Sequence, residues 1–289
     1  MNQYLLVGIL LFRGTFAGWC DEWGDVEWSD EFDGEQLDSS KWNIVCNDIE
    51  GLNCGAVPFG THDPSSKGAE CRSATCIPEA VSVSNGNLVL TSDRDPTNSS
   101  VWTTGAVKTW EKATWSPRDG TYRMCISAKL PGGGGDSAGQ GIWPAHWMMP
   151  QDDSCDPDEG EMDIMEMVSG DGTQWATYHW QDNWPREKCA YPDGHQHVYG
   201  ELYMGDNWAD DFHEYGVERA ETYVAFSVDG KVIVNSTSSD IPVALWSMPF
   251  YLILNSAVGG SWPGEPNAST VSPTFHLIDY VRLARETRA

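Results

Sequence analysis

The sequence predicts an all-β protein built as a sandwich of two antiparallel sheets. Three observations favour this fold class. Short segments of alternating apolar and polar residues recur along most of the 289 residues, with Gly, Pro and Asn between them. Asn-Gly and Asp-Gly pairs join some of these segments as hairpins. Long segments with helical periodicity are hard to find, and many short strands with turn signals are typical of a sandwich.

Four segments carry the clearest strand signals. Residues 81–92 read VSVSNGNLVLTS and turn at an Asn-Gly pair, whereas residues 222–234 read TYVAFSVDGKVIV and turn at an Asp-Gly pair. In residues 121–130, TYRMCISAKL, the apolar residues from Tyr122 to Leu130 share one face at period two. Residues 275–284, FHLIDYVRLA, are predicted to form the final strand.

Strand signals continue from about residue 24 to residue 286, so a single domain over 24–286 is the simplest interpretation. Two long loops interrupt the strands. Residues 47–76 contain three cysteines and four glycines, and residues 131–141 contain four consecutive glycines. Neither loop is expected to be a domain linker, because strand signals flank both. A chain of this length buries a sizeable core.

Residues 1–17 resemble a secretory signal peptide. They contain a short apolar run, Tyr4–Phe12, followed by Thr-Phe-Ala, although no positive charge precedes the run. The run is too short to cross a membrane, and no other stretch is a candidate transmembrane helix. A disordered start of the chain is the alternative.

The eight cysteines agree with secretion. Their number is even and all follow residue 17, so disulfides formed in an oxidising compartment are expected. A zinc site is the alternative, but no close C-x-x-C pair is present, and spacing alone does not give the pairing. Sequons at Asn98, Asn235 and Asn267 permit glycosylation. We therefore expect a secreted, extracellular protein.

The composition excludes some partners. The formal net charge is −26, from 43 acidic residues against 17 Lys and Arg. Such a surface repels nucleic acid, anionic lipid and sulfated polysaccharide, although it also serves solubility. The 15 tryptophans indicate either an aromatic core or exposed stacking platforms. A neutral or cationic ligand is therefore favoured, with no nucleic-acid or membrane partner, and a monomer is expected.

Residues 160–167, GEMDIMEM, place three carboxylates among three methionines and an isoleucine. Carboxylates favour water, so it is unusual to find three of them among apolar residues. Residues two apart in a strand share a face, so Glu161 and Asp163 point the same way. Glu166 lies five positions from Glu161, and a regular strand sends it to the opposite face. A β-bulge between Asp163 and Glu166 would return Glu166 to the first face.

With such a bulge the two glutamate Cα atoms lie roughly 13 Å apart along the strand. Each side chain can lean inward by roughly 4 Å, which leaves the carboxyl groups about 5 Å apart. Retaining glycosidases hold two carboxyl groups at about 5–5.5 Å, whereas inverting enzymes need roughly 6.5–9.5 Å. Neighbouring carboxylates do not all ionise readily, so at least one pKa rises, as a retaining acid requires.

A calcium-binding acidic strand and a solvated sheet edge are the alternatives for this segment. Calcium favours oxygen ligands from loops. A solvated edge would not hold Met162, Ile164, Met165 and Met167 between its acids. The segment therefore predicts a catalytic strand.

The pattern E-x-D-x-x-E, at Glu161, Asp163 and Glu166, resembles the signature of glycoside hydrolase family 16 in its laminarinase-like branch. The resemblance covers residues 28 to 284. The segments that match in order are WSDEFDGEQLDSSKW (28–42), NGNLVLTS (85–92), GTYRMCISAKLPG (120–132), GIWPAHWMMP (141–150) and FYLILNSAVGGSWPG (250–264). It implies a β-jelly-roll sandwich with a concave substrate cleft, and a catalytic domain over 24–286.

The resemblance also implies roles for the three acids. Glu161 would be the nucleophile, Glu166 the acid/base, and Asp163 an assisting residue near the nucleophile. Similarity to the family places substrate-binding side chains around them, for which core packing, a structural histidine or an ordinary glycine turn are the alternatives. They are Trp143, Trp147, His179, Asn255 and Trp262.

A structural calcium ion is a further implication of the resemblance, with no cofactor needed for catalysis. The matching ligands are the carbonyl groups of Glu31 and Gly86 and the carboxylate of Asp279. Oxygen ligands suit calcium. The alternative is that Asp279 only caps a strand.

Together with the resemblance, the sequence implies a secreted, retaining endo-glycosidase that hydrolyses internal β-1,3-glucosidic bonds of laminarin-type glucans by double displacement. Its expected partner is a neutral β-glucan. One alternative is a non-catalytic β-glucan-recognition lectin, although such relatives lose the glutamate pair that is present here. Another is the same chemistry on mixed-linkage glucan or agarose, or transfer to a sugar in place of water.

Overall fold

The computed structural model describes residues 18–21, 23–46, 70–132, 138–151, 157, 159–182, 193–205, 207–237, 241 and 247–286. The expected signal peptide, most of the loop at 47–76, the central glycines of the second long loop, and Cys54, Cys155 and Cys189 lie outside these residues.

Two sheets dominate the described part of the chain. The first has seven strands in the order β12 (His195–Tyr203), β11 (Thr173–Gln181), β10 (Glu161–Glu166), β9 (Ile142–Pro150), β16 (Phe250–Val258), β7 (Ala106–Lys108) and β2 (Asn43–Ile44).

The second sheet runs in the order β15 (Lys231–Thr237), β14 (Tyr223–Val228), β13 (His213–Arg219), β8 (Tyr122–Lys129), β17 (Thr274–Glu286), β5 (Asn87–Arg94), β6 (Trp102–Thr104) and β3 (Thr75–Cys76), with β1 (Gly24–Asp30) on β17 and β4 (Val81–Ser84) on β5. The strand pairs are antiparallel except β3 with β6. The helices of the described residues are 3₁₀ turns at Pro78–Ala80, Pro117–Asp119 and Trp208–Asp210.

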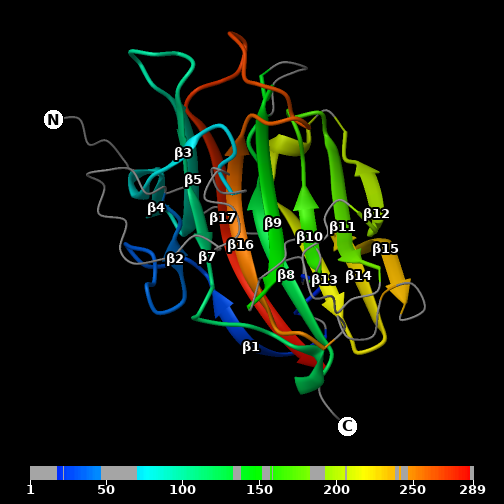
Figure 1. Cartoon of the computed structure of the whole chain (residues 1–289). Helices are drawn as coiled ribbons and strands as arrows, with labels where there is room; N and C mark the ends of the chain where they lie inside the picture. The colour runs from blue at the N-terminus through cyan, green and yellow to red at the C-terminus, as the bar shows by residue number, and fades with distance from the viewer. Residues whose placement is uncertain are drawn as a thin grey trace, which may run out of the picture.

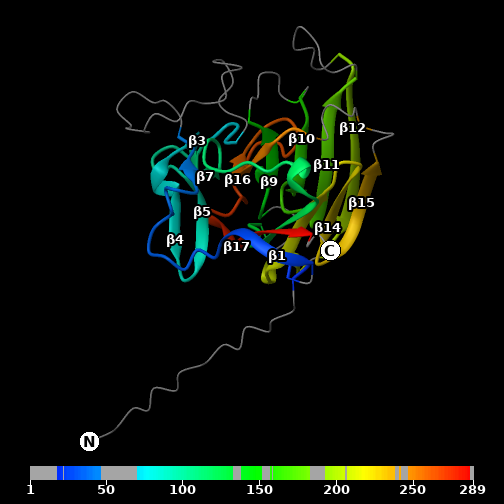
Figure 2. The same cartoon turned by 90° about the horizontal axis from the view of Figure 1, so that it is seen from below.

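The sheets stack as two layers, which confirms the expected all-β sandwich (Figure 1). Seen from below, β9, β10, β11 and β16 lie on one side and β1, β14 and β17 on the other (Figure 2). The layers approach each other where β12 lies beside β15 in both views. Gly200 permits this approach, since a Cβ there would lie 2.6 Å from the carbonyl oxygen of Ile233.

Both expected hairpins are confirmed. The turn between β4 and β5 holds Asn85 at φ 53° and Gly86 at φ 71°, and the turn between β14 and β15 holds Asp229 at φ 48° and Gly230 at φ 72°. A two-residue turn with positive φ at both central positions matches the twist of paired strands. Asn, Asp and Gly tolerate positive φ best.

The core fills the space between the layers. The predicted inward face of β8 is confirmed, because Tyr122, Met124, Ile126, Ala128 and Leu130 all belong to the main buried cluster. Apolar residues of β10, β13, β16 and β17 meet them there. The two inner faces therefore bury a continuous apolar layer, as the alternating pattern requires.

Disulfides join parts of this fold. Cys20 is bonded to Cys125 of β8, Cys71 is bonded to Cys76, and no cysteine in the described ranges is free. Disulfide formation is confirmed for these cysteines, and the zinc alternative is wrong for them. No helix among the described residues has the length and apolar character needed to cross a membrane.

Candidate active site

The carboxylate strand β10 contains the bulge that its sequence predicts. Asp163 pairs with Thr177 of β11, and the next pair joins Glu166 to Trp175, so three steps in β10 match two in β11. The register against β9 shifts in the same place. Ile164 and Met165 are both fully buried between the sheets. One extra residue therefore points inward, and burying two consecutive apolar side chains stabilises the irregularity.

Because of the bulge, Glu161, Asp163 and Glu166 line the same cavity of about 640 Å³. This cavity lies on the face of the seven-stranded sheet that is turned away from the core, and β9, β10, β11, β12 and β16 contribute its walls. The prediction that three acids of one strand converge on one site is confirmed. The expected separation of about 5 Å between the two glutamates stays a prediction.

Glu166 occupies an environment that favours its protonated form. Burial raises the pKa of Glu166 well above its usual value, and the nearby charge of Asp163 raises this pKa further. Two contacts oppose the shift. The indole of Trp143 donates a hydrogen bond to Glu166 Oε1 at 3.0 Å, and the guanidinium of Arg72 acts by its charge. A carboxylic acid that keeps its proton near neutral pH is suited to general acid catalysis.

The buried side chain of Asp163 also contacts β11. Its Oδ2 lies 3.1 Å from His179 Nε2, a distance that suits an ion pair, although the contact does not meet the geometry of a hydrogen bond. His179 also stands opposite Glu161 in the strand register. The imidazole therefore connects the assisting acid to the position of the expected nucleophile.

Three indoles form one side of the cavity. Trp262 is 45% exposed and packs edge-on against Trp143 at 5.3 Å and against Trp175 at 6.0 Å between ring centroids. The guanidinium of Arg72 covers the Trp143 ring at 4.8 Å. Flat apolar rings of this kind suit the C–H faces of sugars, whereas an exposed indole is unfavourable for folding alone.

Trp147 and Asn255 form the floor. The indole of Trp147 donates to Asn255 Oδ1 at 2.8 Å, and the Asn255 amide donates to the carbonyl oxygen of Glu70 at 2.8 Å. Both side chains are buried, and both line the cavity. Their hydrogen bonds fix the floor, since a buried amide left unpaired would be destabilising.

All five residues predicted to bind substrate line the cavity together with the three acids: Trp143, Trp147, His179, Asn255 and Trp262. Other lining residues were not singled out from the sequence. They are Arg72, Pro157, Trp175, Thr177, His195, His197, Tyr199 and Ala257.

A sequence signal exists for some of these missed residues. Trp175, Thr177 and His179 are two residues apart on β11, so they share one face of that strand. The pattern His-x-His-x-Tyr at 195–199 places three side chains on one face of β12 in the same way. Arg72 has no such signal. It reaches the cavity through an isolated bridge to Val258 and a backbone φ of 54°.

The residues expected to hold calcium lie elsewhere, at one junction of the second sheet. β17 pairs with β5 up to Ile278 and with β1 from Val281, so Asp279 falls between its two partners. Glu31 directly follows β1 and Gly86 directly precedes β5. The Glu31 carboxylate binds Arg282 at 2.8 Å, and the predicted ligand is the carbonyl oxygen of Glu31. Calcium binding there stays a prediction.

Comparison with known proteins agrees with this geometry. The family model described as glycosyl hydrolases family 16 matches residues 72–282. A glucan endo-1,3-beta-glucosidase A1 from Niallia circulans is 32% identical over 282 residues, which cover 90% of this chain but 37% of that protein. A beta-glucanase from Rhodothermus marinus is 28% identical over 299 residues, covering 97% of this chain and 92% of that protein.

A solved structure shows the same fold. The laminarinase catalytic domain from Thermotoga maritima superposes with a TM-score of 0.70 at 27% identity, covering 92% of this chain and all of that one. The family match spans most of the chain, and it includes the bulged strand and all the other residues expected in the cavity. The chain belongs to glycosyl hydrolase family 16.

Proposed function

We propose that this protein is an endo-β-1,3-glucanase that hydrolyses internal bonds of laminarin-type glucans with retention of the anomeric configuration. The observation that carries the proposal is the bulge in β10, which brings Glu161, Asp163 and Glu166 into one indole-lined cavity. The names of the Niallia, Rhodothermus and Thermotoga relatives support the choice of substrate.

In the proposed first step, the ionised carboxylate of Glu161 attacks the anomeric carbon while Glu166 gives its proton to the oxygen of the leaving sugar. The bond from the anomeric carbon to that oxygen breaks, and a covalent glycosyl-enzyme forms. The raised pKa of Glu166 supports this role, because the acid must hold its proton until the bond breaks.

In the second step, Glu166 takes a proton from water as the water attacks the same carbon and releases Glu161. Asp163 raises the pKa of Glu166 by its charge and contacts His179, so it supports the acid without attacking the sugar. Trp143, Trp175 and Trp262 would contact sugar rings bound along their side of the cavity.

We also propose that the protein acts outside the cell as a monomer. The disulfides and the apolar N-terminal run support secretion. The net charge of −26 disfavours self-association, which supports a monomer. The same charge supports a neutral glucan as the partner and disfavours nucleic acid and anionic membranes.

The test is hydrolysis of laminarin by the unmodified protein and by Glu161→Gln and Glu166→Gln. We expect reducing sugar from the first and a loss of at least a thousandfold in both variants, with laminarin binding retained. A lectin would bind laminarin without turnover. A panel of laminarin, lichenan and agarose separates the substrates, and product chain lengths separate hydrolysis from transfer. Normal turnover by both variants would overturn the assignment.

A further inference from the structure

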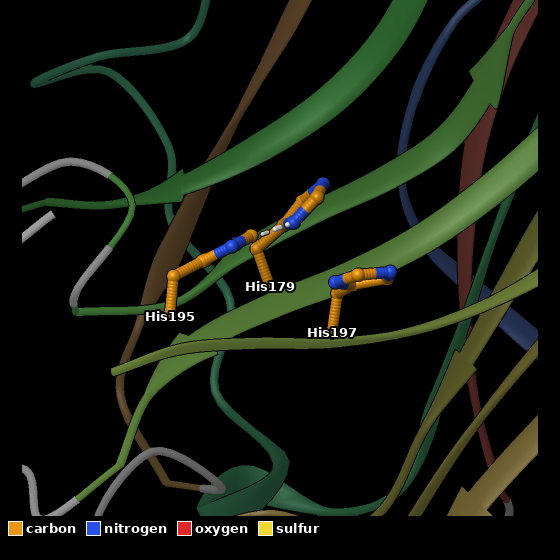
Figure 3. Close-up of side chains that lie close together, drawn as sticks. All are labelled: His179, His195 and His197. Carbon is orange, nitrogen blue, oxygen red and sulfur yellow. Dashed lines mark hydrogen bonds between the residues drawn. The ribbon is translucent and has the colours of Figure 1, made fainter. Parts of the chain in front are cut away.

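Three histidines gather on one wall of the cavity, and the proposed hydrolysis gives no role to two of them. His195 and His197 lie two residues apart on β12, so their side chains share a face. His179 on β11 stands directly opposite His197 in the antiparallel register. Figure 3 shows the three imidazoles on the same side of these neighbouring strands.

The three rings are close enough to share one ion. One nitrogen from each lies within 4.8 Å of the other two, a spacing at which the three residues could hold a metal ion. His179 Nδ1 and His195 Nε2 are 2.9 Å apart. The ring of His197 lies 5.6 Å from that of His195 and 5.9 Å from that of His179, between centroids.

We propose that His179, His195 and His197 form a binding site for a transition-metal dication of the Zn²⁺ class. Zinc binds imidazole nitrogen at about 2.0–2.1 Å, so tetrahedral ligands stand about 3.4 Å from one another. His197 is exposed and the other two histidines are half-buried, so small side-chain rotations can bring the nitrogens to this spacing. Three imidazoles leave a fourth position that faces the cavity.

A carboxylate beside the second nitrogen of His179 supports the same conclusion independently. Asp163 Oδ2 lies 3.1 Å from His179 Nε2. Histidines that bind metals commonly donate their other ring N–H to a carboxylate, which orients the ring. The contact here does not meet hydrogen-bond geometry, and a small rotation of the imidazole or of the Asp163 carboxylate would complete that arrangement. The nitrogen left for the metal is Nδ1, the atom that faces His195.

The ligand chemistry defines the ion. Imidazole suits Zn²⁺, Cu²⁺ and Ni²⁺, whereas Ca²⁺ and Mg²⁺ select oxygen ligands. The net charge of −26 also concentrates cations at the surface. The site therefore takes borderline transition metals and excludes the alkaline earths.

Metal binding would inhibit hydrolysis, a consequence that rests on the proposed function. His179 is the register partner of Glu161, so a dication on these histidines lies next to the expected nucleophile. The positive charge of the metal would attract the Glu161 carboxylate. The fourth ligand of the metal would occupy space that the glucan needs. We expect inhibition that substrate relieves.

The test uses the full, untagged chain after treatment with a chelator, with Co²⁺ as a spectroscopic probe. We expect one Co²⁺ per chain with the intense visible bands of tetrahedral cobalt, displaced by Zn²⁺ but not by Ca²⁺ or Mg²⁺. His195→Gln and His197→Gln should each weaken binding at least tenfold, and Asp163→Asn should weaken it about tenfold. His213→Gln is the matched control, because His213 pairs with Asp229 on the other sheet.

Absence of the Co²⁺ bands, or equal affinity in both histidine variants and the unmodified chain, would overturn the metal site. Equal weakening by His213→Gln would overturn it too. This readout needs no activity. A chain that binds metal but does not hydrolyse laminarin when it is metal-free would contradict the proposed function and support the metal site. A chain that hydrolyses laminarin but binds no metal would support the proposed function and contradict the metal site.

Discussion

The hydrogen bond from Trp143 to Glu166 gives a prediction that can be worked through from the structure. Replacing Trp143 with Phe keeps an aromatic ring but removes the N–H that lies 3.0 Å from Glu166 Oε1. That N–H lowers the pKa of Glu166, because it stabilises the ionised carboxylate. Its removal should therefore leave the acid protonated to higher pH.

The size of the effect follows from hydrogen-bond energetics. A hydrogen bond to a charged group contributes about 1.5–3 kcal/mol, and about 1.4 kcal/mol moves a titration by one pH unit. The smaller phenyl ring admits some water, which partly replaces the lost donor. We therefore take the lower end and expect a movement of about one pH unit.

The assay is the pH dependence of kcat/KM on laminarin. Its alkaline limb reports the general acid of the free enzyme, so this limb should move upward in Trp143→Phe while the acid limb, which reports the nucleophile, stays in place. Trp175→Phe is the matched control. Trp175 lines the same cavity, but its indole N–H has no hydrogen-bond partner among the described residues, so this variant should weaken binding without moving the limb.

Two results would refute the reasoning. An alkaline limb that stays in place or moves downward in Trp143→Phe would mean that Glu166 is not the acid, or that the indole does not stabilise its ionised form. An equal upward shift in Trp175→Phe would mean that loss of aromatic surface, and not of the donor, moves the titration.

Three further predictions concern stability. The pKa of Glu166 is higher in the folded state than in the unfolded chain, so its burial costs stability as pH rises above about 4.3; Glu166→Gln should therefore raise Tm at pH 8 and not at pH 4, and an equal change at both would contradict this. Met165→Ala should lower the free energy of unfolding in urea by about 2–5 kcal/mol, because Met165 is fully buried at the bulge; a loss below about 1 kcal/mol would show that the bulge repacks. Burial lowers the pKa of His276 to about 3, so this residue should cost about 1.4 kcal/mol of stability per pH unit as pH falls from about 6.5 towards that value. In His276→Gln, the free energy of unfolding measured in urea should therefore fall less between pH 7 and pH 5 than in the unmodified chain. An equal fall in both proteins would refute this prediction.

Much of the fold was predictable because its signals are local. Asn85-Gly86 and Asp229-Gly230 need positive φ, which few residue pairs tolerate, so the hairpins follow from short segments. The inward face of β8 follows from its period of two. The order of strands in each sheet does not follow in this way, since it depends on pairings between distant segments such as β8 and β17.

The same distinction between local signals and long-range pairing applies to the candidate site. The separation of five positions between Glu161 and Glu166, and the apolar residues around these acids, were enough to predict the bulge in β10. The contact of Arg72 with Trp143 was not predictable, because it joins residues about seventy positions apart through a loop with positive φ. The histidines of β12 show alternation in the sequence, but only the register of β11 against β12 places His197 opposite His179.

The stereochemistry of the first product tests whether the bulge makes Glu161 and Glu166 a nucleophile and acid/base pair. Proton NMR during laminarin hydrolysis distinguishes the two anomers of a newly formed reducing end before they interconvert. Double displacement predicts that the β anomer appears first and the α anomer follows by mutarotation. An α anomer in the earliest spectra would mean a single displacement and would contradict the paired roles of the two glutamates.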